Sequence, residues 1–473
     1  MFVRVYQLGS DFVLNSKINT LSTTRMCVRS FKMKKKQSRQ SLVTNTQRAL
    51  EHFDLHYKPV YKDLWPSMRI ALLTAKKTCA IMNNFAQDDK FNKHFYELGA
   101  IDIIHNAVNK QLQDIKSKTP TNIEQIERKF VNQNIDNQFD ELTDDSDDEL
   151  LDTTEREKAN VLTEEERMNI DRTNLYSFVP TKTVYSENES LRLEESRKSV
   201  YTPMDVKVDI IKPRKINIPT DLSVMSFPKG DVQNFPSPKL DIPHGVLCHF
   251  MLDAASILPV IALDLDKGDN VLDLCAAPGG KTLTILQTGL PGSLTCNDIS
   301  GSRINRLLNI LHSYIPQEDR EHVNIHSKAG SYFTDPIFDK VLVDVPCSTD
   351  RHSLLVDDNN LFNPNRINER IELPKLQKEL LIAGIKSCRP GGCVVYSTCS
   401  LSAAQNDGVI QDTIDDLWRT TSIDIVVEDL SEMTQLFNDF YRFYNECRFG
   451  QLVLPSLSSN YGPMYFSRLR RVG

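Results

Sequence analysis

The chain has 473 residues, of which 40% are apolar and 25% charged, proportions typical of a soluble globular protein of two or three domains. No apolar run reaches the roughly 18 residues needed to span a bilayer. The ten cysteines include no close C-x-x-C pair, so we expect reduced thiols and neither a disulfide framework nor a structural zinc site.

Residues 1–40 have the composition of an organelle presequence followed by a basic arm. Among the first fifty residues the only acid is Asp11, whereas Arg, Lys, Ser and Thr are frequent. Arg-rich, Ser-rich and acid-poor segments are typical of organelle presequences, and the features of a secretory signal are missing. A disordered basic arm is the alternative, and the cluster at 32–39 also fits a nuclear or RNA-contacting segment.

Residues 41–132 are predicted to form a mainly helical N-terminal region, because apolar residues recur near helical spacing over 64–85. Residues 141–168 then carry twelve acids and three bases, so the rest of the chain sums to +2 although the whole chain has a net charge of −7. Such dense like charge usually stays unfolded. We therefore predict an acidic, disordered linker over 133–200 and an extended connecting segment over 201–242.

From residue 243 to 473 the pattern changes to alternating strands and helices. Residues 249–265 have the apolar spacing of a helix. Strands are expected at 270–274, 293–298, 323–327, 340–345, 393–398, 425–430, 451–456 and 464–469, and helices at 281–288, 301–314, 373–388 and 404–419. This alternation predicts an α/β fold with a doubly wound, Rossmann-like sheet, and the closely spaced last strands predict an antiparallel edge hairpin.

A glycine turn, "VLDLCAAPGGKTLTIL" at 271–286, follows the first of these strands. It is not a P-loop, because Cys275 stands where that motif needs its first glycine. It is not the dinucleotide fingerprint either, because Gly279 and Gly280 are adjacent and no third glycine follows. What remains is a turn where the backbone approaches a ligand at the carboxyl end of a strand, or a tight turn with no ligand.

Asp298 ends the next strand, nineteen residues after Gly279. An acid near this spacing hydrogen-bonds a ribose hydroxyl in nucleotide-binding sheets, which favours a nucleoside-bearing ligand. Asp298 could instead cap the following helix. Lys281 is placed to meet a phosphate or carboxylate.

Two cysteines follow two further strands. "VLVDVPCSTD" places Asp344 and Cys347 after one strand, and "CVVYSTCSLS" places Cys399 after the next. If the two strands are neighbours, both thiols face the crevice where doubly wound sheets bind ligands. His352 raises the alternative of a Cys–His hydrolase, which the absence of an oxyanion loop disfavours.

The motifs "DLCAAPGGKT", "DVPCSTDRHS" and "YSTCSLSAAQND" resemble those of the Nol/Nop/Sun family of RNA cytosine-5 methyltransferases. Further stretches, among them "LWPSMR", "FPKGD" and "NYGPMYF", resemble the family's mitochondrial ribosomal-RNA member. The resemblance covers most of 45–90 and nearly all of 225–473. It implies a methyltransferase domain at 243–473 that uses S-adenosylmethionine.

The resemblance also implies roles for individual residues. Cys399 would be the nucleophile that adds to cytosine carbon 6, Cys347 would help the methylated base leave, and Asp344 would touch the base near nitrogen 3 and lie near the cofactor amine. The cofactor contacts it implies are Gly279, Gly280, Lys281, Asp298, Arg303 and Gly330. One departure is Ala329, where the family usually carries an Asp that contacts adenine.

For the whole protein, the resemblance implies cytosine methylation in mitochondrial small-subunit ribosomal RNA, in the matrix, with a role in mitoribosome assembly. The chain lacks a strongly basic footprint and a separate RNA-binding module. We therefore expect a partner protein to contribute basic surface, and the resemblance implies a helical-repeat protein of the mitochondrial transcription-termination-factor type. No membrane or metal is expected. The alternatives are a non-catalytic ribosomal-RNA-binding assembly factor with the same fold, and a nicotinamide-dependent oxidoreductase.

Overall fold

The computed structural model describes residues 43–473, apart from 87–88, 114–186, 204–207 and 213–214. The presequence and basic arm predicted for 1–40 therefore lie outside the described residues, as do 133–186 of the predicted acidic linker. Within the described ranges, no helix is both long and apolar enough to cross a membrane.

The N-terminal part begins with two helices, α1 (Asn45–Tyr61) and α2 (Trp65–Leu73), joined by the short turn η1 (Lys62–Leu64). The Thr44 hydroxyl accepts a hydrogen bond from the Gln47 amide and so caps α1. Phe53, Tyr57 and Tyr61 recur every fourth residue and are buried, which gives α1 one apolar face that packs on the rest of the molecule.

The predicted helices over 64–85 and 249–265 are partly wrong. Helix α2 ends at Leu73, and β1 (Cys79–Met82) pairs antiparallel with β7 (His249–Leu252) and with β4 (Val224–Ser226). Short apolar runs such as these cannot be assigned to helix or strand by periodicity, and pairing decides. The small sheet has the order β2-β4-β1-β7, with β2 at Ile101–Asp102.

Part of the predicted linker is also helical. Residues Glu187–Lys198 form α6, which packs beside α11 (Ile367–Ser387). The half-buried guanidinium of Arg370 donates two hydrogen bonds to the Glu195 carboxylate, at 2.6 and 3.0 Å. This bidentate contact attaches α6, a polar helix, to α11.

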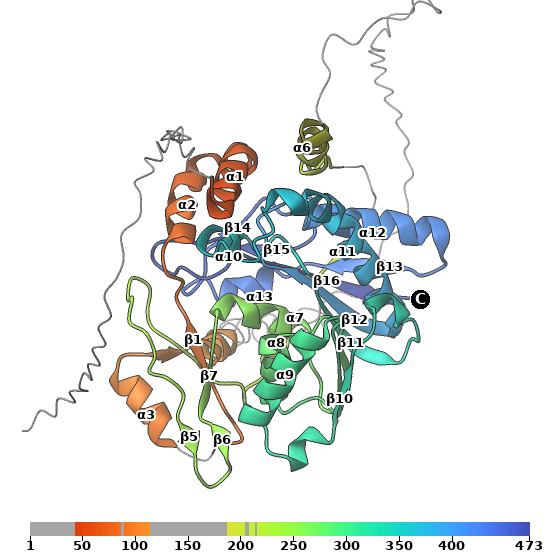
Figure 1. The fold of residues 1–473 in the computed structure, drawn as a ribbon. Helices are drawn as coiled ribbons and strands as arrows, with labels where there is room; N and C mark the ends of the chain where they lie inside the picture. The colour runs from red at the N-terminus through yellow and green to blue at the C-terminus, as the bar shows by residue number, and fades with distance from the viewer. Residues whose placement is uncertain (1–42, 87–88, 114–186, 204–207, 213–214) are drawn as a thin grey trace, which may run out of the picture. The chain divides into compact units, whose positions relative to one another are not determined.

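The main sheet confirms the predicted doubly wound α/β fold (Figure 1). Its strand order is β10-β9-β8-β11-β12-β16-β13-β3. Outside this order, β15 pairs with β16, and β14 pairs with β15. The strands are β3 (Ile210–Ile211), β8 (Asn270–Asp273), β9 (Ser293–Asn297), β10 (Val323–His326), β11 (Phe338–Asp344), β12 (Cys388–Thr398), β13 (Ile425–Glu428), β14 (Phe443–Tyr444), β15 (Gln451–Val453) and β16 (Met464–Arg471). All eight predicted strands are present.

The predicted antiparallel pair is present as β15 and β16, but β16 does not lie at the edge of the sheet. Strand β16 is inserted between β12 and β13 and runs antiparallel to both. It is buried from Met464 to Leu469, so burial on both faces, and not an edge position, accounts for its apolar sequence.

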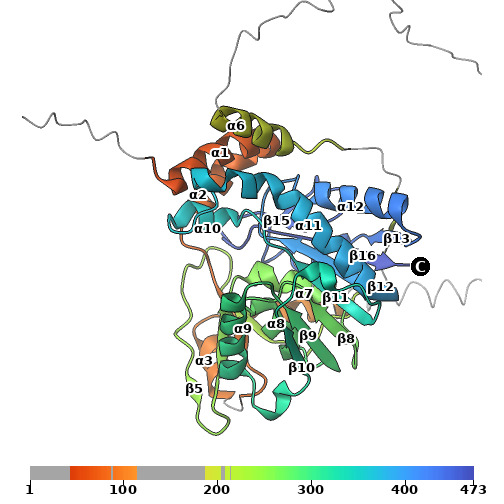
Figure 2. The same ribbon diagram turned by 45° about the vertical axis from the view of Figure 1, so that its right-hand side comes forward.

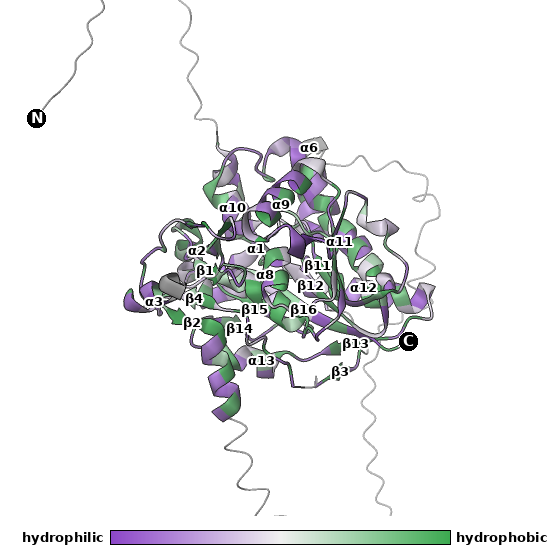
Figure 3. Cartoon of the chain, turned by 90° about the horizontal axis from the view of Figure 1, so that it is seen from below, coloured by the Kyte–Doolittle hydropathy of each residue, from purple (hydrophilic) through white to green (hydrophobic). Residues whose placement is uncertain are grey.

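Helices cover both faces of the sheet (Figure 2). One face carries α7 (Leu258–Ala262), α8 (Gly280–Gln287) and α9 (Gly301–Tyr314), and the other carries α11 and α12 (Asp407–Thr420). Figure 3 shows hydrophobic residues concentrated on the central strands and hydrophilic residues dominating outer helices such as α6. The remaining elements are α3 (Asp89–Glu97), β5 (Leu240–Asp241), β6 (Val246–Leu247), η3 (Ala254–Ile257), η4 (Glu318–Arg320), η5 (Gly330–Tyr332), α10 (Asp350–Leu355), η6 (Pro364–Arg366) and α13 (Ser431–Leu436).

Candidate active site

Two cysteines meet beyond the carboxyl ends of two neighbouring strands. Strands β11 and β12 are parallel and adjacent, with Asp344 opposite Ser397 in the register. The loops that follow bring the sulfur atoms of Cys347 and Cys399 to 3.1 Å. The condition set by the sequence, that the two strands be neighbours, is met. Cys347 is buried and Cys399 is partly exposed, so Cys399 is the more accessible of the two thiols.

A lysine–aspartate pair lies beside the thiols. Lys281 Nζ donates a hydrogen bond to Asp344 Oδ2 at 2.8 Å, and the Ser397 hydroxyl donates to Asp344 Oδ1 at 2.7 Å. Burial lowers the pKa of Lys281, but the charge and hydrogen bond of Asp344 outweigh it and leave the pKa raised. The lysine is therefore a fixed positive charge in this site.

The pKa of the Cys399 thiol is raised well above its ordinary value. The largest cause is its hydrogen bond with Cys347, followed by burial and by the nearby charge of Asp344. Lys281 opposes these effects, because its positive charge favours the thiolate. The neighbours of Cys399 therefore have opposite effects: Cys347 and Asp344 favour the neutral thiol, whereas Lys281 favours the thiolate.

The glycine turn positions Lys281. Gly279 has φ +118°, a left-handed conformation that side chains rarely adopt, and a Cβ there would lie 2.8 Å from Leu307 Cδ1 of α9. Helix α8 starts at the next residue. The Thr282 hydroxyl donates at 2.7 Å to Asp273 Oδ2, and burial raises the pKa of Asp273 to about 7.

A cavity of about 150 Å³ opens at the ends of β8 and β9. Asp298 is almost fully buried there: Oδ1 accepts from the Ser300 amide at 2.9 Å, and Oδ2 lies 3.3 Å from Arg303 Nη1. Asp298 does not cap α9 itself, because the N-cap residue is Ser300 and Asp298 accepts from the Ser300 amide in the turn before the helix. The cavity is lined by Leu274, Cys275, Asn297, Asp298, Ile299, Arg303, Ala329, Gly330, Ser331, Pro346, Leu376, Glu379 and Leu380.

The predicted site residues thus fall into two groups. Asp298, Arg303 and Gly330 line the cavity, whereas Lys281 and Asp344 lie with the two thiols. Gly279 and Gly280 form the turn between them and are not in the cavity wall. The α11 wall, formed by Leu376, Glu379 and Leu380, was missed, because only tertiary packing brings this helix to the cavity.

The cavity suits the adenosine part of S-adenosylmethionine. Asp298 Oδ2 is buried and forms an ion pair with Arg303 but accepts no hydrogen bond, so it still has the capacity to accept one from a ribose hydroxyl. Gly330 allows Leu380 of α11 to pack closely against it in the cavity wall, because a Cβ there would lie 2.5 Å from Leu380 Cδ2. Ala329 supplies no side-chain acceptor.

His352 does not form a Cys–His pair. It is exposed on α10, and the hydrogen-bond partner of Cys399 is Cys347. Across the part of the chain that the structure describes, no group of three or more His, Cys, Asp or Glu side chains could hold a metal ion.

Comparison with known proteins identifies the family. A model of the 16S rRNA methyltransferase RsmB/F family matches residues 260–469. The 5-cytosine rRNA methyltransferase NSUN4 of Xenopus laevis is 38% identical over 90% of this chain and 90% of its own length, and that of Mus musculus is 36% identical over 94% of each. The chain belongs to the Nol/Nop/Sun family of RNA cytosine-5 methyltransferases.

A further relative is the mitochondrial tRNA (cytosine(34)-C(5))-methyltransferase of Danio rerio, 42% identical over 47% of this chain and 61% of its own length. As a Nol/Nop/Sun methyltransferase, the chain is an enzyme that takes its methyl group from S-adenosylmethionine and transfers it to carbon 5 of cytosine in RNA.

Proposed function

We propose that this enzyme methylates a cytosine in mitochondrial small-subunit ribosomal RNA, through a covalent adduct on Cys399, and acts in mitoribosome assembly. The observation that carries the covalent mechanism is the 3.1 Å contact between two thiols at adjacent strand ends. The choice of ribosomal RNA is supported by relatives that are named rRNA methyltransferases and match over about nine-tenths of their length.

The chemical problem is that carbon 5 of cytosine is a poor nucleophile. In the proposed mechanism the Cys399 thiolate adds to carbon 6, which makes carbon 5 electron-rich and divides one hard step into two easier ones. When bound, S-adenosylmethionine supplies an electrophilic methyl group for carbon 5. Lys281 favours the Cys399 thiolate through its positive charge.

Asp344 and Cys347 complete the proposed chemistry. Asp344 contacts the base near nitrogen 3, where proton donation to the ring makes it a better acceptor for the thiolate. Lys281 and Ser397 hold this carboxylate from both sides. Cys347 serves as an acid–base group for release of the methylated base, and its contact with Cys399 Sγ places it next to the bond that must break.

The proposed cofactor contacts follow the two groups of residues. Asp298 binds the ribose, Gly330 lies beside the adenine, and Arg303 fixes Asp298 and also donates to the Ala277 carbonyl. Gly279, Gly280 and Lys281 hold the methionine end. The methyltransferase domain proposed for 243–473 contains all of these residues, and 260–469 of it match the family model.

The proposed location is the mitochondrial matrix, and the proposed partner is a helical-repeat protein of the mitochondrial transcription-termination-factor type. The mitochondrial relative supports the compartment. The charge outside residues 141–168, which sums to only +2, supports the need for a partner, because the chain does not carry the excess of basic residues typical of an independent RNA binder.

The test is bisulfite sequencing of mitochondrial and cytosolic RNA after depletion of the protein. We expect one cytosine of the mitochondrial small-subunit ribosomal RNA to lose methylation, and wild-type protein but not Cys399→Ala to restore it. Loss confined to a transfer RNA would contradict the proposed substrate. Equal rescue of a ribosome defect by Cys399→Ala would favour the non-catalytic assembly factor.

A further inference from the structure

A buried carboxylate lies beneath the two cysteine loops and has no part in the chemistry described above. Asp350 is the first residue of α10 and is fully buried. Burial raises its pKa, while hydrogen bonds from its neighbours lower it. A carboxylate that is desolvated in this way is costly unless each oxygen is satisfied, so its partners show what it holds.

Its partners come from both cysteine loops. The Ser348 hydroxyl donates to Asp350 Oδ1 at 2.5 Å, and the Leu401 amide donates to Oδ2 at 2.7 Å. Ser348 directly follows Cys347, and Ser400 directly follows Cys399. The two serine hydroxyls are 2.7 Å apart, and that of Ser400 also reaches Asp350 Oδ1 at 3.3 Å. One carboxylate therefore joins the two segments that carry the thiols.

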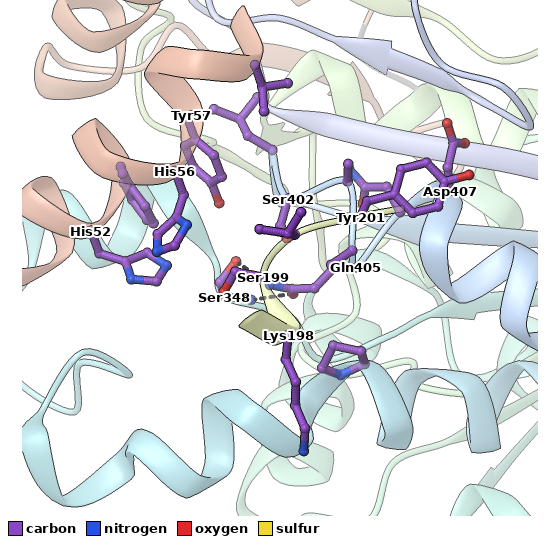
Figure 4. A pocket seen from close by; sticks show the side chains of 18 of the residues that line it. His52, His56, Tyr57, Lys198, Ser199, Tyr201, Ser348, Ser402, Gln405 and Asp407 are labelled. Carbon is purple, nitrogen blue, oxygen red and sulfur yellow. Dashed lines mark hydrogen bonds between the residues drawn. The ribbon is translucent and has the colours of Figure 1, made fainter. Parts of the chain in front are cut away.

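The N-terminal helix contributes to the same cluster. The Tyr57 hydroxyl of α1 donates to Asp350 Oδ2 at 2.9 Å, and the Tyr61 hydroxyl donates to the Leu401 carbonyl at 2.7 Å. Figure 4 shows Tyr57 in the wall of a cavity of about 480 Å³, facing Ser348 and Gln405 of the cysteine loops. Helix α1 is thus hydrogen-bonded directly to the loops of the site.

We propose that Asp350 is a positioning residue that holds Cys347 and Cys399 in contact, and that Tyr57 extends this clamp to helix α1. A thiol is a weak donor and a weak acceptor, so the contact between the two sulfurs is too weak to fix two loops by itself. Charge-assisted hydrogen bonds to a buried carboxylate are stronger. The role in catalysis rests on the proposed function of the two cysteines, whereas the spacing itself can be measured without RNA.

The test uses the rate at which diamide joins the two thiols. Diamide accepts the two hydrogens lost when Cys347 and Cys399 form a disulfide, and mass spectrometry of the linked peptide follows its formation in the full chain. We expect Asp350→Ala to slow cross-linking by about tenfold, the factor that corresponds to losing a buried hydrogen bond to a charged group. Asp350→Asn, which keeps one acceptor, should fall between Asp350→Ala and wild type.

Asp407→Asn is the matched control. Asp407 is also buried and accepts hydrogen bonds from a tyrosine hydroxyl, Tyr465, and from the backbone amides of Arg448 and Phe449, but it contacts neither cysteine loop's serine. It should lower the melting temperature and leave cross-linking at the wild-type rate. Wild-type cross-linking in Asp350→Ala, with a similar loss of melting temperature, would overturn the proposal and leave Asp350 a purely structural residue.

Tyr57→Phe keeps the test decisive if the aspartate variants do not fold. It removes one hydroxyl and keeps the buried ring, so we expect a smaller slowing of cross-linking and a lower kcat with an unchanged KM for RNA. Tyr465→Phe should change neither. Equal cross-linking rates in Tyr57→Phe and wild type would contradict the proposal that Tyr57 extends the clamp to α1. Rapid cross-linking in wild-type protein that does not methylate RNA would contradict the proposed function and not the clamp.

Discussion

At the scale of single residues, the site is organised around one ionisation. Cys399 must lose its proton to attack a base, yet its contact with Cys347 and its burial both raise its pKa. Lys281 is the group that opposes them, and it is itself held by Asp344 at 2.8 Å. We therefore expect the balance between these neighbours to set the pH at which Cys399 becomes a thiolate.

Replacing Lys281 with Met should shift this balance to higher pH. Without the positive charge the pKa of Cys399 rises further, so the thiolate and the methylation rate should appear only at more alkaline pH. The pH dependence of Cys399 alkylation by iodoacetamide measures this directly. Lys375→Met, an exposed position on α11, is the control. An unshifted alkylation profile in Lys281→Met would refute this role for the lysine.

Removing the Cys347 thiol should have the opposite effect. Its hydrogen bond is the largest cause of the raised pKa of Cys399, so Cys347→Ala should let Cys399 react with iodoacetamide at lower pH. The alkylation profile of this variant, compared with that of wild type, tests the sign. A profile shifted to higher pH would contradict the interpretation that Cys347 suppresses the ionisation of Cys399.

Much of this site was predictable from residues at strand ends. Parallel strands direct their carboxyl ends to one edge, so the sequence alone groups Asp298, Asp344, Cys347 and Cys399. It places Asp350 shortly after Cys347, at the end of "VLVDVPCSTD", but gives it no role, and it does not group Glu379 with the site, because both roles depend on packing between distant segments. The sequence contains no local signal that the Tyr57 hydroxyl would donate a hydrogen bond to Asp350 Oδ2, at 2.9 Å.

At the scale of elements, close approach between helices and the sheet shapes the site. Helix α11 packs on β11 at Gly384, where a Cβ would lie 2.5 Å from Val343 Cγ2. The same helix forms one wall of the cofactor cavity through Leu376 and Leu380. Displacement of α11 would therefore change both the stability of the sheet and the shape of the cavity.

Gly384→Val should lower the free energy of unfolding by about 1–3 kcal/mol, the usual range for overpacking a core. Urea denaturation followed by circular dichroism measures this. Gly301→Val is a matched control in the first turn of α9, where a Cβ meets no atom within 4 Å; it should change stability by less than about 0.5 kcal/mol. Similar stabilities for the two variants would show that the close contact at Gly384 does not affect the free energy of unfolding.

The elements that sequence reasoning missed have a common cause. Strands β1 and β7 are four residues each and, apart from His249, apolar throughout their pairing with one another, so no period distinguishes them from helix. Helix α6 lies within a charged segment and is docked by the ion pair between Glu195 and Arg370. In contrast, the longer helices and the buried parallel strands matched their predictions, because periodicity and flanking turns agree there.

At the scale of the whole molecule, a buried ion network joins the last strands to the N-terminal side of the sheet. Arg468 on β16 is 1% exposed and lies 2.6 Å from Glu428 of β13 and 3.2 Å from Asp264, which follows α7. Removing one partner of a buried pair leaves an uncompensated charge, which commonly costs about 3–5 kcal/mol. The stability of the domain therefore depends on ion pairs between segments far apart in the sequence, the one at Asp264 and the last strands.

Glu428→Gln should destabilise the protein by about 3 kcal/mol, at the low end of this range, because Asp264 still pairs with Arg468. Urea denaturation is again the measurement, with the exposed Glu432→Gln of α13 as control. A change below about 1 kcal/mol would show that Asp264 alone satisfies the arginine.

The central claim is that the sulfur of Cys399 bonds to carbon 6 of the substrate cytosine. It is tested most directly by incubating Cys347→Ala with mitochondrial ribosomal RNA and S-adenosylmethionine, and identifying the denaturation-resistant adduct by mass spectrometry. Because Cys347 is assigned to release, the adduct should accumulate, and its modified peptide should contain Cys399. Efficient methylation by Cys399→Ala, or a cytosine bonded to any other residue, would contradict the account.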